Sequence, residues 1–138
     1  RSSGDFDVET VVRRLDAVQA WTKAGIMIRE SLHPGSAHAF ALVSSGKGAA
    51  FQYRAANGGT SAQAGIIPGL APFRLRLSRR GAQISAFARA EGATTWQPLG
   101  TITTTMGSSI YVGMAVTSHD VTRAASATFD FIAITGIS

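Results

Sequence analysis

Polar side chains crowd into one stretch of the chain, KAGIMIRESLHPGSAHAFALV at residues 23–43. They are Lys23, Arg29, Glu30, His33 and His38. Cationic side chains can hydrogen-bond to sugar hydroxyls or attract anions, and imidazole can bind a metal. His33 and His38 are five residues apart around a Pro-Gly pair, with no obvious third ligand, so we expect a turn packed by imidazole hydrogen bonds. For the cations, a binding face and the solvated side of a sheet are both open.

The acidic residues are few, and their placement gives no sign of hydrolytic chemistry. A glycosidase needs two carboxylates that face each other roughly 5–9.5 Å apart, and no pair in the sequence indicates such an arrangement. Asp5 and Asp7 near the start and Asp130 near the end could gather around a structural Ca²⁺ if the terminal strands pair. The alternative is surface acids that balance nearby arginines. Cysteine is absent, which excludes disulfides and thiolate chemistry.

Most of the chain alternates polar and apolar residues with a period of two, between short turns rich in Gly, Ser and Asn. The pattern predicts strands at residues 5–15, 21–31, 37–45, 49–56, 73–80, 82–90, 96–104, 109–118 and 125–134. The NGG at 57–59 and Gly81 mark hairpin turns. No long helix is expected. The prediction is an all-β fold, an antiparallel β-sandwich of the jelly-roll type, in one domain spanning residues 1–138.

Alternation also predicts which side chains face the sandwich core. Ile26, Ile28, Phe51 and Met114 belong to the apolar, core-facing sets, and the Ile, Phe and Leu residues of 23–43 are expected to anchor the core. The opposite faces combine small residues with planar polar groups that suit a shallow sugar-binding floor. The expected ligand contacts are Lys23, Arg29, Gln52, Arg54 and Tyr111, with Trp21 at a strand start and His119 in a strand-end loop. The competing interpretation is an ordinary solvated sheet face.

The net charge of +5 comes from eleven Arg and two Lys scattered along the chain. The densest group, Arg74, Arg76, Arg79 and Arg80, is expected to be a solvated strand face, with an anionic polymer as the alternative. No aromatic residues interleave with these arginines, so no nucleic acid is expected as a partner. No run of about 18 apolar residues suggests a membrane span. The chain begins at Arg1 without Met, which suggests a piece of a longer protein.

Several segments, KAGIMIRES, GSAHAF and YVGMAVTSH above all, give the chain its resemblance to a known family. From Gly4 to about Ile134 it resembles the bacterial concanavalin A-like (laminin-G-like) jelly-roll domains, and more closely the subset called "regulation of enolase protein 1-like". The resemblance implies two packed antiparallel sheets inside a large secreted bacterial protein, beside glycoside hydrolases or carbohydrate-binding modules. Laminin-G-like modules often bind calcium. Enzyme relatives with this fold carry a Glu-x-Asp-x-x-Glu strand, which this chain lacks.

These observations together favour a non-catalytic accessory module that binds a polysaccharide or another glycan outside the cell. Its other partners would be neighbouring domains of the same parent chain, and we expect a monomer with no cofactor other than the possible Ca²⁺. The main alternative is a structural spacer or protein-interaction module without glycan binding. Trp96, which follows a hairpin, is expected to pack structurally rather than to bind sugar.

Overall fold

The computed structural model describes residues 2–3, 5–15, 23–31, 35–44, 48–60, 62–69, 72–90, 92–104, 106, 109–117 and 127–137. Every regular element in these ranges is a β-strand. These described ranges contain no helix that could span a membrane. The predicted all-β class is confirmed.

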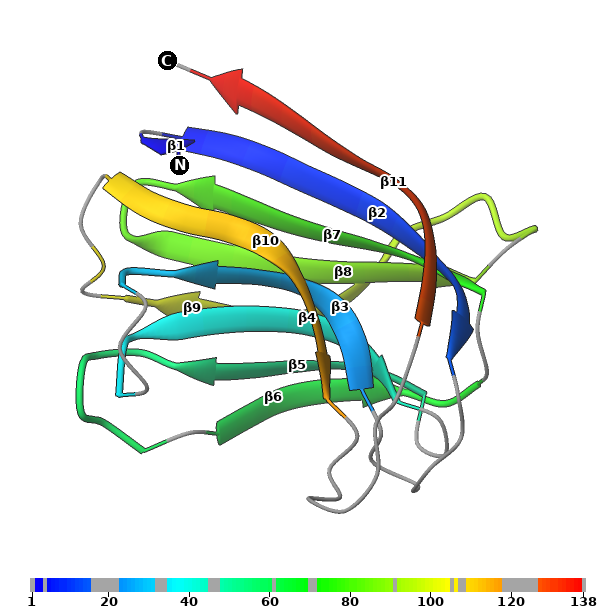
Figure 1. Cartoon of the computed structure of the whole chain (residues 1–138), viewed down its shortest axis with the longest axis horizontal. Coiled ribbons are helices and arrows are strands. Elements are labelled where there is room, and N and C mark those ends of the chain that lie inside the picture. Colours follow the sequence, from blue (N-terminus) through cyan, green and yellow to red (C-terminus); the bar gives the residue numbers. More distant parts are fainter. Residues whose placement is uncertain are drawn as a thin grey trace.

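Two antiparallel sheets pack face to face (Figure 1). The six-stranded sheet has the order β1-β10-β3-β4-β5-β6, and the five-stranded sheet has the order β11-β2-β7-β8-β9. The strands are β1 (Ser2–Ser3), β2 (Asp5–Leu15), β3 (Lys23–Arg29), β4 (His38–Ser44), β5 (Gly48–Arg54), β6 (Ala62–Ile67), β7 (Phe73–Arg80), β8 (Gln83–Ala90), β9 (Gln97–Thr103), β10 (Ser109–Thr117) and β11 (Ala127–Ile137). The predicted antiparallel β-sandwich is therefore confirmed.

The local sequence explains why these segments form strands with one buried face. In β7, Phe73, Leu75 and Leu77 are buried, while the residues between them are only partly covered. Such alternation is expected when one face of a sheet packs on a core and the other faces solvent. The β7–β8 hairpin turns at Gly81, whose positive φ of 61° suits glycine. Inner-facing side chains of both sheets form a single apolar core.

The stretch at 23–43 forms the predicted pair of strands around a turn. β3 pairs antiparallel with β4, with Lys23 opposite Ser44 and Arg29 opposite His38. The first long strand and the last, β2 and β11, also pair as a jelly roll requires. One strand was not predicted: β6 has the sequence AQAGII, whose Ala, Gln and Gly residues have low strand propensity. It pairs with β5 across the predicted NGG turn.

Two predictions about the core are wrong. Phe40 and Leu42 lie opposite Met27 and Gly25, so they share the outer face of the six-stranded sheet rather than the core. There they are buried in a separate apolar cluster, because β4 is apolar on both faces and the register decides which set turns inward. Met114 has the core-facing parity but is 48% exposed. On the same strand, Ile110 is fully buried, so the core thins out along β10.

At the β6–β9 side of the sandwich the two sheets approach each other closely. A Cβ placed on Gly65 of β6 would overlap the carbonyl oxygen of Leu99 on β9. A Cβ on Gly100 would lie 2.8 Å from the Cβ of Ala64. Both strands are also irregular: the register shifts between Phe51 and Gln52 against β6, and between Ala86 and Phe87 against β9.

Candidate functional site

The outer face of the six-stranded sheet brings together most of the predicted contact residues. The cross-strand register places Tyr111, Arg29, His38 and Arg54 side by side in one row across β10, β3, β4 and β5. The next row holds Gly113, Met27, Phe40 and Gln52. Lys23 lies farther along β3 on the same face, since residues two apart in a strand point the same way. The predicted common face for these polar side chains therefore exists.

A broad open pocket of about 540 Å³ occupies part of this face. Its floor includes Met27 and Phe40, and Lys23, Gln52 and Gln63 line it with polar groups. Lys23 Nζ donates to Gln52 Oε1 at 3.0 Å, and Gln52 Nε2 donates to Gln63 Oε1 at 3.2 Å. This chain of hydrogen bonds fixes the side chains before any ligand arrives, which lowers the entropy that binding must remove.

The floor beneath these side chains is tightly packed. Phe40, Leu42 and Ala50 form the separate apolar cluster, with Met27 and Ala115 against it. Next to Leu42, a Cβ on Gly25 would overlap the carbonyl oxygen of Ala41 and lie 2.7 Å from the Cα of Leu42. Only glycine fits there, so strands β3 and β4 can pack without a side chain between them.

The charge on this face is positive. Arg29 and Arg54 flank His38, Lys23 lies farther along the same face, and none of the described residues that point outward from this sheet is acidic. Burial lowers the pKa of the Lys23 ammonium. Burial also lowers the pKa of His38, and the three cations add to that effect, while the carbonyl oxygen of Ser36 opposes it. His38 is therefore neutral at pH 7, and the face attracts electron-rich ligands.

Arg29 and Arg54 lie on the outer face and also form hydrogen bonds to the backbone of the adjoining turns. Arg29 Nε donates to the carbonyl oxygen of Ser31 at 3.1 Å, and Arg54 Nε donates to that of Gly59 at 2.9 Å. These bonds brace the ends of the β3–β4 and β5–β6 hairpins. The pocket itself is lined by Lys23 and Gln52 rather than by the two arginines. Tyr111 lies at the β10 end of the row and is exposed.

His38 gives the face a pH dependence that can be measured. Because its pKa in the folded state lies below the ordinary value of about 6.5, the unfolded chain binds the proton first as the pH falls. The contribution to stability is therefore complete above pH 6.5 and is lost as the pH falls through the window below it. We expect His38→Gln to lose less unfolding free energy than the wild type between pH 7.5 and 5.5. Urea unfolding at both values checks this, and equal losses in the two proteins would contradict it.

Three predicted residues lie outside the described part of the chain: Trp21, His119 and the turn residue His33. The centre of the Trp96 ring lies 5.1 Å from the guanidinium carbon of Arg89, and its structural role stays a prediction. Five lining residues of the pocket were not among the predicted contacts: Met27, His38, Phe40, Ala62 and Gln63. Gln63 belongs to β6, whose sequence does not predict a strand. Only the NGG hairpin signal could have indicated that a strand returns along β5.

The three aspartates predicted to hold calcium lie at separate positions in the five-stranded sheet. Asp7 pairs with Thr135 on β11, five residues from Asp130, so roughly 16 Å of strand separates the two positions. Asp7 is also bound by Arg76, Arg80 and the Ser78 hydroxyl. Asp5 accepts a bond from the backbone N–H of Gly81 at 2.8 Å. Within the described ranges no three His, Cys, Asp or Glu side chains gather, and calcium binding stays a prediction.

The predicted basic cluster on β7 is divided by the sheet. Arg74, Arg76 and Arg80 turn outward, whereas Arg79 is buried with the core-facing set. Arg79 donates to the carbonyl oxygens of Gly81 at 3.0 Å and Met106 at 2.7 Å. Arg76 and Arg80 bind Asp7. The four arginines therefore do not form a single solvated face.

Comparison with known proteins identifies the fold. A GH43 protein from Bacillus licheniformis has a TM-score of 0.77 and 14% identity over 96% of this chain. A xylan beta-1,4-xylosidase from Bacillus halodurans has a TM-score of 0.68 and 21% identity over 97% of this chain. This chain spans 28% of the length of each. A functionally unknown Saccharomyces cerevisiae protein, of which it spans 72%, has a TM-score of 0.71 and 21% identity over 99% of this chain.

Neither the protein-family models nor the curated proteins give a match. At identities this low the structural likeness shows the fold and nothing further. The two-sheet sandwich matches one part of each of these two longer Bacillus chains.

Proposed function

We propose that this sandwich is a non-catalytic carbohydrate-binding accessory module of a secreted bacterial protein, and that it belongs to the "regulation of enolase protein 1-like" subset. One observation carries the proposal: the open pocket on the outer sheet face, with an apolar floor and a hydrogen-bonded row of Lys23, Gln52 and Gln63. The chain would act as a monomer beside other domains of its parent protein.

The size and chemistry of the pocket suit a few sugar rings. A volume of about 540 Å³ lies within the usual 300–1,000 Å³ of small-molecule sites. Amide groups can both donate to and accept from ring hydroxyls, and the Lys23 ammonium adds a donor. Met27 and Phe40 offer apolar surface to the C–H groups of a sugar ring. The outward Arg29, Arg54 and Tyr111 extend the same surface.

The absence of acids from the described lining of this pocket supports binding without hydrolysis. Glycoside hydrolysis needs two carboxylates across the scissile bond, and the lining residues are Lys, Met, His, Phe, Gln and Ala. The printed names of the structural neighbours give the first ligands to try. One is a xylan beta-1,4-xylosidase, and another is the GH43B of a Bacteroides ovatus xyloglucan PUL.

The test is a binding screen with xylan, xyloglucan and a panel of neutral and acidic polysaccharides, with calcium and with a chelator. Affinity electrophoresis finds the ligand, and calorimetry with its oligosaccharide gives the dissociation constant. We expect Gln52→Ala combined with Gln63→Ala to weaken binding at least tenfold, because two hydrogen-bonding side chains are lost, each worth about 1 kcal/mol. A calcium-dependent affinity would add the metal to the mechanism.

A control comes from the other sheet, where Gln83 and Gln97 are exposed amide side chains on β8 and β9. Gln83→Ala combined with Gln97→Ala should bind as the wild type does. Equal weakening in both double variants would place the glycan elsewhere. Binding to no polysaccharide in the panel would overturn the proposal.

The second candidate is a structural or protein-interaction module, and two exposed side chains of β10 favour it. Met114 is 48% exposed and Tyr111 is 36% exposed. Both line a separate pocket of about 320 Å³ that is largely apolar. Such exposed apolar surface is typical of a contact with a neighbouring domain or protein. This function would be supported if glycan binding is absent and Met114→Lys abolishes association with an adjacent domain of the parent chain.

A further inference from the structure

The candidate glycan site continues beyond the pocket that carries the proposed function. The pocket of about 320 Å³ on β10 lies beside it on the same outer sheet face, and Met27 lines both pockets. We infer, resting on the proposed glycan binding, that the two pockets are subsites of one groove. Its ligand would be an internal stretch of a polysaccharide chain, rather than a single sugar or the end of a chain.

One row of residues across the sheet forms the floor of this groove. The register places side by side one residue from each of five strands, from β10 to β6: Gly113, Met27, Phe40, Gln52 and Gln63. Every member of the row lines one of the two pockets. Neighbouring strands lie about 4.8 Å apart, so four intervals make a row of roughly 19 Å. That length suits several linked sugar rings and exceeds what one ring can fill.

The groove reaches both edges of the six-stranded sheet. β6 is the last strand on one side, and on the other side β10 is followed by β1 alone. β1 pairs with Ser109 and Ile110, so within the described strands none lies outside β10 at Gly113. Both pockets are open to solvent. A chain can therefore enter at one edge and leave at the other, whereas a closed pocket would stop a chain at its end.

The pocket on β10 has side chains that suit a sugar ring. Tyr111 presents an exposed aromatic ring with a hydroxyl group. Arg29 lines the same pocket and lies at its boundary with the first one, because its Nη1 donates to the Sδ of Met27 at 3.5 Å. A Cβ on Gly113 would meet no atom within 4 Å, so the floor between Tyr111 and Ala115 is open. Hydrogen-bonding groups beside a partly apolar floor thus repeat the chemistry of the first pocket.

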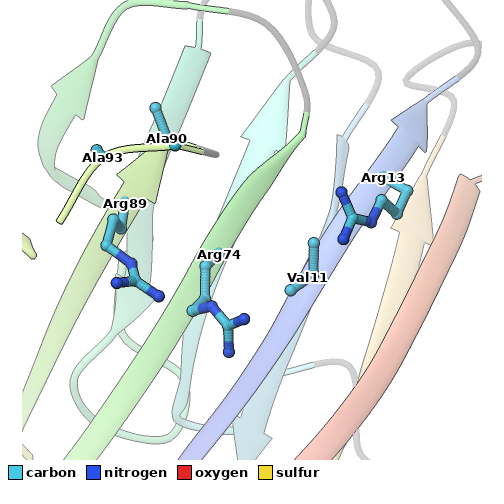
Figure 2. Close-up of a pocket in the computed structure, with 7 residues that line it drawn as sticks. Val11, Arg13, Arg74, Arg89, Ala90 and Ala93 are labelled. Atoms are coloured by element: carbon cyan, nitrogen blue, oxygen red, sulfur yellow. The ribbon is translucent and has the colours of Figure 1, made fainter.

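The pocket on the opposite outer face is too small for such a chain. Its volume is about 130 Å³, against about 540 Å³ and 320 Å³ for the two subsites. Arg74 and Arg89 of neighbouring strands line it, together with Val11 and Arg13 of β2 (Figure 2). A chain of several rings therefore has more room on the six-stranded sheet, where two pockets meet at Met27.

The test is calorimetry of the intact chain with oligosaccharides of two to six rings. They are prepared from xylan, from xyloglucan and from any other polysaccharide that binds in the screen. We expect the affinity to rise at least tenfold between three rings and six, because only the longer chain reaches the β10 subsite. Reduction of the end sugar of the six-ring oligosaccharide should change its affinity less than twofold, since the groove holds the middle of a chain.

Gly113→Leu should remove the gain from chain length, because its side chain fills the floor of the β10 subsite and its Cβ meets no other atom. Six rings should then bind no more tightly than three. Tyr111→Ala is the second variant should Gly113→Leu fail to fold. The control is Thr103→Leu, which adds the same side chain at an exposed position of β9 on the other sheet and should leave both affinities unchanged.

Two results would overturn the inference and leave the proposed function standing. One is equal affinity for three and six rings, or a gain with chain length that survives both variants. The other is loss of binding on reduction of the end sugar, which would show recognition of a chain end. Binding of no polysaccharide would end the proposed function and this inference together. Association with an adjacent domain that Gly113→Leu abolishes would then assign the groove to a protein contact.

Discussion

Gly25→Ala is expected to lower the free energy of unfolding by about 3 kcal/mol, the upper part of the range for overpacking a tight site. The added Cβ would overlap the carbonyl oxygen of Ala41 and lie 2.7 Å from the Cα of Leu42. Both are backbone atoms, so no side-chain rotation can relieve the clash. β3 and β4 must separate instead, which disturbs the apolar cluster under the proposed glycan pocket. Urea unfolding at pH 7 measures the loss.

Gly113→Ala is the matched control for this substitution. Gly113 lies on the same outer face, on the neighbouring strand β10, and a Cβ there meets no atom within 4 Å. With alanine in place of glycine the unfolded chain has less conformational freedom to lose on folding. This variant should therefore be as stable as the wild type or slightly more stable. If the Gly25→Ala protein is as stable as the Gly113→Ala protein, the backbone accommodates the added methyl group and the predicted clash is wrong.

Asp7→Asn should destabilise the fold by about 1–2 kcal/mol at pH 7, below the 3–5 kcal/mol typical of a fully buried pair. The Asp7 side chain is 12% exposed and lies 3.2 Å from Arg76 Nη2 and 3.1 Å from Arg80 Nη2. Asparagine leaves two guanidinium groups without their anion. The arginines are 31% and 45% exposed, so water compensates part of the loss.

The same substitution has a defined pH dependence. Burial alone would raise the pKa of Asp7, but the bonds from Ser78 and Arg80 and the charges of Arg76 and Arg80 outweigh it and hold that pKa below its ordinary range. The stabilisation is therefore present above the unfolded pKa of about 3.9 and is lost as the pH falls through the folded value. The gap between wild type and Asp7→Asn should narrow between pH 7 and pH 3.

Unfolding across that pH range checks the prediction, with Glu9→Gln as the control. Glu9 is the next residue along β2 that points the same way, and removing its charge should change stability by less than about 0.5 kcal/mol, as at most surface positions. A gap between wild type and Asp7→Asn that stays constant with pH would contradict the assigned role of the carboxylate.

The fold was largely predictable because polar and apolar residues alternate regularly along most of its strands. FRLRLSRR places each apolar residue two positions from the next, and the structure assigns the strand the predicted bounds, Phe73–Arg80. Prediction failed where alternation carries no information. HAFALVS is apolar on both faces, so only the register with β3 places Phe40 outside the core. AQAGII lacks strand formers, and pairing with β5 makes it a strand.

The sequence predicted several residues of the candidate site, but it did not predict how they are arranged in space. The common face of Arg29, Gln52 and Arg54 follows from alternation once β3, β4 and β5 are neighbours. The sequence does not show that these three strands are neighbours. It also does not show the contact between Lys23 and Gln52, which are 29 residues apart.

The close approach of β6 and β9 has a consequence for how this sandwich behaves at high concentration. A sheet edge with free backbone donors and acceptors invites strand addition from another molecule. Here both edges are interrupted by a register shift, and β9 carries Pro98, which has no N–H to offer. The backbone of Gly65 also lies against that of Leu99. An incoming strand finds no regular ladder at this side, so the domain is protected there against edge-to-edge aggregation.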